Sequence, residues 1–352
     1  MSQLSHIKKA LIVVAVGAIA LLGAELPAQA KPVVPLVLYS AQGYDQDIAT
    51  AFTKATGIPV KLTDDSTGPL LAKVQAEKNN PQWSVLWVDG NTAFAALDRQ
   101  NQLASYTPKA TFNAVGESLL PKDQSYVPTG TTTMAAFIYN ATTMKNPPKT
   151  YQDLLKPEYK GLIGMNDPSQ SGPTFPFIAG LFNQLGGEGT GVIQGEKFFT
   201  KLKANGLHVY PTNGNTKHAL EIGEIQGGLI QSSAAQGEVL KFTAKPQAGF
   251  DPKVIYLPKS TLLPSVIGID KKASATVKAE AGKLIEFILS PAGQAVMQGG
   301  DPSGDSLFWP VVPGVNALPG LPAFPAAVQA IDPYFWGPKQ SDINTWFDSN
   351  IK

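Results

Sequence analysis

The chain has 352 residues, of which 43% are hydrophobic and 16% charged, and its formal net charge is +1. This composition is typical of a globular protein long enough for two domains, and it excludes a strongly basic surface for nucleic acid or anionic lipid. The absence of cysteine excludes disulfides, thiolate metal sites and a lipid anchor on an N-terminal cysteine. Arg99 is the only arginine, so a bidentate arginine clamp on an anionic ligand is not expected.

Residues 1–30 are expected to form a cleaved signal peptide. Lys8 and Lys9 precede an apolar run over 10–24, and Ala28-Gln29-Ala30 matches the A-x-A pattern of a cleavage site. An uncleaved anchor is the alternative, but the run is short for a membrane span. Export without cysteine is typical of a freely soluble protein of a bacterial periplasm.

Strand-like and helix-like segments alternate in the first part of the exported chain. Strands are predicted over 35–39, 58–62 and 83–88, and each leads through a polar turn into a helix. For the second helix, Gly68 is expected as the N-cap and Pro69 as the first helical residue. Three such units predict an α/β fold with a mostly parallel sheet covered by helices on both faces.

A long β segment over 130–140 is predicted to cross into a second lobe built in the same way. There, strands are expected over 161–165, 208–210 and 227–231, with helices between them and one helix ending at Gly186-Gly187. Strands around Ile255 and Val266 would return the chain to the first lobe. The expected organisation is lobe 1 over 31–133 and 259–300, lobe 2 over 134–258, and a wrapping segment over 301–352.

Polar turns follow the predicted strands of both lobes, where ligands bind in open α/β sheets. Helix N-termini at these turns offer free N–H groups and a positive dipole end to an anion or hydrogen-bond acceptor, although any one turn alone could simply cap its helix. The expected ligand contacts in lobe 1 are Ser40, Gln42, Gly43, Ser66, Thr67, Gly68 and Asp89. Those in lobe 2 are Ser171, Thr174, Ser232 and Ser233.

Signatures of enzymes and metal sites are weak. His208 and His218 are each expected to be structural, and no G-x-S-x-G nucleophile elbow is present. The Gly187–Gly191 run matches neither the dinucleotide nor the P-loop spacing, and no His, Tyr or carboxylate residues are spaced for a metal. The sequence therefore predicts a protein without enzymatic activity, resident metal or cofactor.

Several segments in a fixed order resemble the type II periplasmic solute-binding proteins of ABC importers, in the ferric-iron-binding-like group. These segments are KATGIPV at 54–60, NPQWSV at 80–85, FIYN at 137–140, GMNDPSQSG at 164–172 and LIEFILSPAGQ at 284–294. The resemblance implies a two-lobe fold with hinge strands, expected near 131–139 and 227–230. It also implies capture of a small solute by a monomer that works with a membrane permease and binds no nucleic acid.

The resemblance leaves several ligands open. Iron-binding members carry a tyrosine pair where Ser232-Ser233 stand, so a phosphonate or phosphate-bearing anion is favoured over ferric iron or another metal. Asp89, with Asp64 or Asp65, could receive an amine, as in an aminophosphonate. A polyamine or thiamine could instead be held by these aspartates against Trp87, and a secreted hydrolase on the same fold also stays open.

Overall fold

Ten strands within residues 34–352, the part of the chain that this computed structural model describes, pair into one mixed sheet. The order along the sheet is β2-β1-β3-β9-β5-β8-β6-β7, and β4 and β10 pair with β9. The predicted leader lies outside the described residues. The strands are β1 Leu36–Ser40, β2 Val60–Asp64, β3 Val85–Asp89, β4 Leu103–Ala104, β5 Val127–Asn140, β6 Ile163–Asn166, β7 His208–Tyr210, β8 Gly227–Ile230, β9 Pro252–Asp270 and β10 Val328–Gln329.

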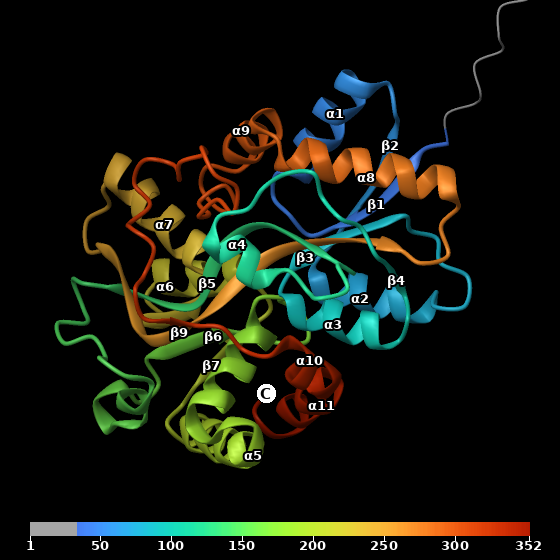
Figure 1. The fold of residues 1–352 in the computed structure, drawn as a ribbon. Helices are drawn as coiled ribbons and strands as arrows, with labels where there is room; N and C mark the ends of the chain where they lie inside the picture. Colours follow the sequence, from blue (N-terminus) through green and yellow to red (C-terminus); the bar gives the residue numbers. More distant parts are fainter. Residues whose placement is uncertain (1–33) are drawn as a thin grey trace, which may run out of the picture. The chain divides into compact units, whose positions relative to one another are not determined.

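Helices follow the strands in alternation, which confirms the predicted α/β fold (Figure 1). The α-helices are α1 Asp45–Thr56, α2 Thr67–Ala76, α3 Asn91–Arg99, α4 Ala114–Leu119, α5 Thr174–Ala204, α6 Asn213–Glu221, α7 Ser232–Ala244, α8 Ala275–Leu289, α9 Pro291–Gly300, α10 Pro333–Trp336 and α11 Gln340–Asn350. Short 3-10 helices are η1 Tyr151–Leu155, η2 Pro157–Tyr159 and η3 Gly337–Lys339.

Lobe 1, which contains β1–β4 with α1–α3, α8 and α9, buries both faces of its sheet. Side chains of β3 alternate between two cores because successive residues of a strand point to opposite faces. Val85 and Trp87 pack in the core that holds α1 and α8, whereas Leu86 and Val88 pack in the core of α2 and α3. The near-continuous apolar run of β3 is therefore the signature of a strand covered on both faces.

Lobe 2 contains β6–β8 with α5–α7, and two long strands join it to lobe 1. The first part of β5 pairs with the second part of β9 beside lobe 1, and the second part of β5 pairs with β8 in lobe 2. The predicted crossing strand is therefore β5. The expectation of a second hinge at Gly227–Ile230 is wrong, because β8 pairs with β5 and β6 inside lobe 2 and the second crossing strand is β9.

The start of α2 differs from the prediction by two residues. Ser66 has extended φ/ψ angles and is the N-cap, so Gly68 already lies within the helix. Pro69 is tolerated there because the N–H groups of the first turn have no partner within the helix. The expected break at Gly186-Gly187 is confirmed, since Gly187 has a φ of 58° and divides α5 into two helical parts.

The C-terminal segment contacts both lobes. β10 pairs with β9 at Ser260 and Thr261, and the Tyr334 hydroxyl donates to Asp98 on α3. In α11, Ile343 and Phe347 are buried in the same core as α5. This segment therefore ties α3 of lobe 1 to α5 of lobe 2.

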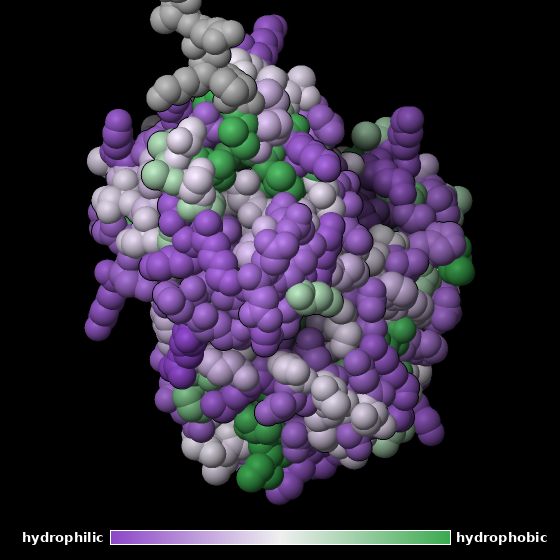
Figure 2. Space-filling view, turned by 90° about the vertical axis from the view of Figure 1, so that its right-hand side faces the viewer, coloured by the Kyte–Doolittle hydropathy of each residue, from purple (hydrophilic) through white to green (hydrophobic). Residues whose placement is uncertain are grey.

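Hydrophilic residues dominate the face shown in Figure 2, and hydrophobic residues form small separate patches there. Among the described residues, the exposed large hydrophobic side chains are Val34, Ile193 and Ile222. None of the helices within residues 34–352 has the length and hydrophobicity to span a bilayer.

Candidate functional site

A cleft of about 380 Å³ lies at the carboxyl ends of the strands of both lobes. Parallel strands bring their carboxyl ends to one edge of the sheet, so the loops after β1, β2 and β3 meet those after β6, β7 and β8. Lobe 1 lines the cleft with Ala41, Gln42, Gly43, Asp45, Gln46, Asp64, Asp65, Ser66, Thr67 and Asp89. Lobe 2 contributes Gln170, Ser171, Gly172, Pro173, Thr212, Asn213, Gly214 and Gln231, and the C-terminal segment contributes Asp305.

The cleft is acidic: it contains Asp45, Asp64, Asp65, Asp89 and Asp305, and none of the described residues that line it is Lys or Arg. Asp45 is only 3% exposed, and its Oδ2 atom has no hydrogen-bond partner among the described residues. Burial raises the pKa of Asp45 to about 6. Burial and the charge of Asp89 raise the pKa of Asp305 to about 7. The site thus holds negative charge that no side chain of the cleft neutralises.

Asp89 is at the centre of a hydrogen-bond network between the lobes. Its Oδ1 accepts from Gln42 Nε2 at 3.1 Å and from the Ser265 hydroxyl, and its Oδ2 accepts from Gln231 Nε2 at 2.9 Å. Gln42 is held in turn by the Tyr44 hydroxyl, which donates to its Oε1 at 2.7 Å. Burial raises the pKa of Asp89, and these three donors oppose the shift. Asp89 is therefore largely satisfied by the protein, in contrast to the Oδ2 atom of Asp45.

Two helices direct their N-termini into the cleft from opposite lobes. Ser66 precedes α2 and Thr212 precedes α6, and neither side chain makes the capping hydrogen bond to its helix. Thr67, Asn213 and Gly214 in the first turns line the cleft. The first N–H groups of a helix lack intrahelical partners and lie at the positive end of its dipole, so they can receive an anionic oxygen.

The lobes touch at the edge of the cleft. The Gly68 N–H of lobe 1 donates to the Gln170 carbonyl oxygen of lobe 2 at 3.3 Å. A Cβ atom on Gly172 would lie 2.4 Å from the Thr67 Cβ atom. Backbone of lobe 2 thus approaches α2 closely, and only glycine fits at this contact.

Comparison with known proteins identifies the family. The profile of the family described as bacterial extracellular solute-binding protein matches residues 47–329. The chain belongs to this family. It is a periplasmic-type substrate-binding protein of the ABC importer class with the type II solute-binding fold, as the resemblance predicts.

Relatives of this solute-binding protein are named for different ligands. A candidate 2-aminoethylphosphonate-binding periplasmic protein of Salmonella paratyphi A is 27% identical over 340 residues, which is 93% of each chain. The major ferric iron-binding protein of Neisseria gonorrhoeae is 27% identical over 218 residues, covering 60% of this chain and 63% of the relative. The crystal structure of iron-bound HitA from Pseudomonas aeruginosa matches with a TM-score of 0.73 and 23% identity, covering 90% of this chain and 99% of HitA. This last likeness concerns the fold.

The structure brings together six of the eleven residues expected to contact the solute. The residues that line the cleft are Gln42, Gly43, Ser66, Thr67, Asp89 and Ser171. The other five are not among the residues that line the cleft: Ser40, Gly68, Thr174, Ser232 and Ser233.

Contacts within the protein account for the positions of three of these five residues. Ser40 is fully buried, and its hydroxyl accepts from the Gln42 N–H. Gly68 makes the contact between the lobes described above. The Ser232 hydroxyl accepts from the Thr133 N–H of β5 at 3.0 Å, so this part of α7 faces the sheet. Thr174 and Ser233 are fully buried, and their hydroxyl oxygens have no partner among the described residues.

Several cleft residues of the solute-binding protein are absent from the expected set. Asn213 and Gln231 follow strands β7 and β8, so their position at the ends of strands was a usable signal. Asp45 comes directly after the turn that follows the first predicted strand, in the first turn of α1. Asp305 reaches the cleft from the C-terminal segment and accepts from the Gly43 N–H at 2.8 Å, a contact that no local pattern indicates. Among residues 34–352, no cluster of three His, Cys, Asp or Glu is placed to hold a metal ion.

Proposed function

We propose that the solute of this protein is a small zwitterion with an amine at one end and a phosphonate or phosphate group at the other, and that 2-aminoethylphosphonate is the first candidate. The observation that carries the proposal is the unpartnered, buried Oδ2 atom of Asp45 in a cleft that also receives two helix N-termini. The relative from Salmonella paratyphi A, whose name contains 2-aminoethylphosphonate, supports the same chemistry.

The amine of the solute binds on the side of Asp45. A buried carboxylate without a partner is costly, and an ammonium group restores the interaction that burial removes. Asp64 and Asp65 line the same wall and add to the negative potential there. Asp89 contributes charge but keeps its three protein donors, so its role is to hold Gln42 and Gln231 in place.

The phosphonate binds between the first turns of α2 and α6. Ser66 and Thr67 offer hydroxyl groups there, and the Thr67 N–H of α2 and the first N–H groups of α6 provide donors without formal charge. In α2 the Gly68 N–H already donates to the Gln170 carbonyl oxygen, and Pro69 has no N–H. This arrangement explains how an anionic group is accepted in a cleft without Lys or Arg among its described lining residues. The two ends of the solute then meet opposite potentials within the same cleft.

Solute capture closes the lobes by movement about β5 and β9. A ligand that contacts both lobes binds the closed state better than the open state and shifts the population toward it. We further propose that the protein is exported with cleavage after about Ala30, acts as a monomer in the periplasm, delivers its solute to a membrane permease, and neither binds nucleic acid nor catalyses a reaction. The Salmonella relatives have names of periplasmic binding proteins, which supports this placement.

Isothermal titration calorimetry with three matched compounds tests the proposal. Ethylphosphonate lacks the amine of 2-aminoethylphosphonate, and ethanolamine lacks its phosphonate. The complete zwitterion should bind at least tenfold tighter than either fragment, because each lost contact to a charged group costs about 1.5–3 kcal/mol. Equal affinity for ethylphosphonate and 2-aminoethylphosphonate would contradict a role for the amine.

A purely cationic solute is the second candidate, because the cleft is acidic. Putrescine and thiamine belong in the same titration series. If putrescine or thiamine binds more tightly than 2-aminoethylphosphonate, the solute is a polyamine or thiamine and not a zwitterion. A ferric ligand would instead change the tyrosine absorption spectrum during titration with an iron salt, and we expect no change.

A further inference from the structure

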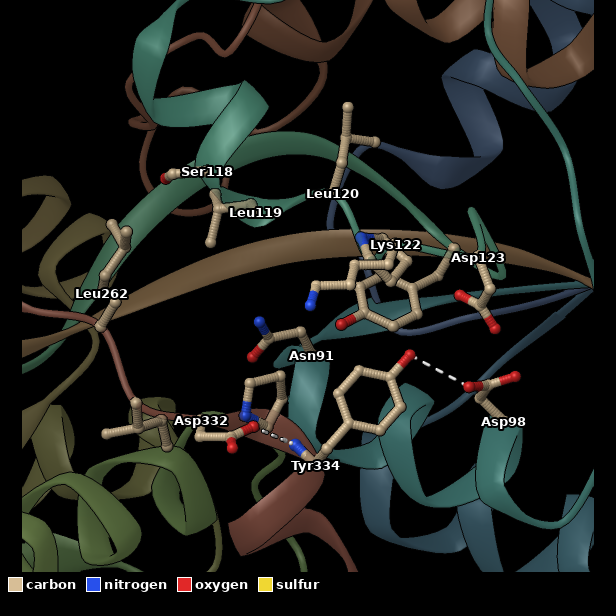
Figure 3. Close-up of a pocket in the computed structure, with 15 residues that line it drawn as sticks. Asn91, Asp98, Ser118, Leu119, Leu120, Lys122, Asp123, Leu262, Asp332 and Tyr334 are labelled. Carbon is tan, nitrogen blue, oxygen red and sulfur yellow. Dashed lines mark hydrogen bonds between the residues drawn. The ribbon is translucent and has the colours of Figure 1, made fainter. Parts of the chain in front are cut away.

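A second cavity, of about 530 Å³, lies away from the cleft (Figure 3). It is enclosed by α3, the turn over 118–123, strand β9 and the C-terminal segment over 330–334. None of its lining residues lines the cleft. Its volume is in the range of cavities that hold small organic ligands.

One wall of the second cavity is apolar. Leu119, Leu262 and Ile331 line it and are each at least nine-tenths buried. Tyr126, which is 2% exposed, and the half-buried Tyr334 add two aromatic rings. These groups provide a surface for an apolar or aromatic body rather than for a hydrated ion.

The opposite side of the second cavity carries carboxylates. Asp98 accepts from the Tyr334 hydroxyl at 3.0 Å, and Figure 3 shows this bond at the edge of the cavity near Asp123. Burial raises the pKa of Asp98, and the charge of Asp123 adds to the shift. With Asp332, the lining holds three carboxylates and one lysine, Lys122, and the charge of Lys271 also acts on Asp98, so the cavity keeps an excess of negative charge.

Asn91 provides a hydrogen-bonding group at the same cavity. It is 9% exposed, and its side-chain amide makes no hydrogen bond to another described residue. Figure 3 shows this amide pointing into the cavity between Tyr334 and Lys122. The amide atoms of Asn91 are not among the buried atoms that lack a partner, so they are open to the cavity and can both donate to and accept from a polar group there.

We propose that the second cavity binds a small organic cation: a primary ammonium group on an apolar or aromatic body. The ammonium lies between Asp98 and Asp123, the body packs on Leu119, Leu262 and the ring of Tyr334, and a polar substituent of the ligand reaches Asn91. This site is separate from the solute cleft and does not depend on the identity of the solute.

Calorimetry with phenethylammonium chloride as the probe tests this site. The full exported chain should bind the probe, and the Asp98→Asn/Asp123→Asn double variant should bind it at least tenfold more weakly. The neutral analogue 2-phenylethanol should also bind at least tenfold more weakly than phenethylammonium. Asn91→Ala should reduce binding of a hydroxylated probe, tyramine, by a few-fold.

Two controls keep the test decisive. Asp342→Asn removes an exposed carboxylate of α11 that lines neither cavity, and Asp45→Asn removes the amine partner in the cleft; both should leave probe affinity unchanged. A thermal melt verifies that each variant is folded, and a crystal soaked with phenethylammonium locates the probe if the double variant does not fold. No binding to the wild-type chain, unchanged binding to the folded double variant, or loss of binding in Asp45→Asn would overturn the proposal.

Discussion

The two lobes line the same cleft with different chemistry. Lobe 1 contributes four aspartates, Asp45, Asp64, Asp65 and Asp89, whereas all the described lining residues of lobe 2 are uncharged. Both lobes nevertheless present a helix N-terminus, α2 on one side and α6 on the other. The lobes therefore resemble each other in how their strands and helices place ligand-binding turns, and differ in the charge that these turns carry.

This difference indicates how closure depends on the solute. When the lobes meet, the carboxylates of lobe 1 lose water, and lobe 2 brings no cation to compensate. An unsatisfied buried polar group costs about 1–3 kcal/mol, and more when it is charged. A solute with an amine removes this cost, so it stabilises the closed state more than a solute without one.

Asp45→Asn removes the carboxylate whose Oδ2 atom has no partner among the described residues, and it should have the largest effect. Affinity for 2-aminoethylphosphonate should fall by about 2–5 kcal/mol, the usual cost of truncating one partner of a buried charged pair. The free protein should become more stable at the same time, because a buried, unpaired charge has been removed. Calorimetry measures the first change and thermal denaturation the second.

Asp47→Asn is the matched control for that variant. Asp47 lies in the first turn of the same helix, is exposed and does not line the cleft. The Asp47→Asn variant should bind 2-aminoethylphosphonate with the same affinity as the wild type. Equal affinities of wild type and Asp45→Asn would remove Asp45 from the amine site.

Thr67→Ala tests the proposed binding site of the phosphonate. The variant keeps the helix N-terminus but loses a hydroxyl that lines the cleft, and affinity should fall by about 1–3 kcal/mol if the hydroxyl contacts a charged oxygen in the closed state. Thr67→Ser retains the hydroxyl and should recover most of the loss. An unchanged dissociation constant for Thr67→Ala would exclude Thr67 as a contact.

The pH dependence of solute binding tests the ionisation of the aspartates that lobe 1 contributes to the cleft. Binding of an amine requires the charged carboxylates, so affinity should rise with pH. It should be roughly tenfold weaker at pH 5 than at pH 8, since a carboxyl group with a pKa of about 6 is only about one-tenth ionised at pH 5. Asp45→Asn should show a shallower dependence, which separates this effect from titration of the phosphonate.

The free protein should show the opposite trend in stability. Asp45 and Asp305 have folded-state pKa values of about 6 and about 7, above the usual value for aspartate. Their contribution to stability is therefore present below that usual value and is lost as the pH rises through 6 and 7. Melting temperatures measured without solute should decrease between about pH 4 and about pH 7, and a flat profile would contradict the raised pKa values.

Gln231→Ala should have the smallest effect. It removes the donor of lobe 2 to Asp89, which retains its donors Gln42 and Ser265, so solute affinity should fall by about 0.5–1.5 kcal/mol. Gln236→Ala, in the helix that follows Gln231 but bonded to the Gly320 carbonyl oxygen, is the control and should have wild-type affinity. If Gln231→Ala lowers solute affinity as much as Asp45→Asn does, closure depends mainly on the hydrogen bond between Gln231 and Asp89.

The sequence allowed the fold and the location of the cleft to be predicted because both depend on local signals. Apolar strands, polar turns and helix starts are short-range features, although the start of α2 lies two residues before its predicted position. The carboxyl ends of parallel strands must in turn share an edge of the sheet. The direction in which a turn residue points is not local. Ser232 faces β5 because of how α7 packs on the sheet, and this packing could not be read from its neighbours.

The acidic character of the site was only partly predictable for the same reason. Asp89 and the pair Asp64 and Asp65 follow strands, and the sequence indicated a role for them with an amine. Asp45 differs from Asp64 and Asp65 by its deep burial. Asp305 lies in the C-terminal segment, far along the chain from the Gly43 N–H with which it forms a hydrogen bond. Both features depend on tertiary contacts between distant parts of the chain.

A crystal structure of the protein grown with 2-aminoethylphosphonate would show which end of the solute lies beside Asp45. We expect the amine nitrogen within hydrogen-bond distance of Asp45, and N–H groups from the first turns of α2 and α6 donating to the phosphonate oxygens. A phosphonate beside Asp45, or an amine directed at the helix N-termini, would contradict this expectation.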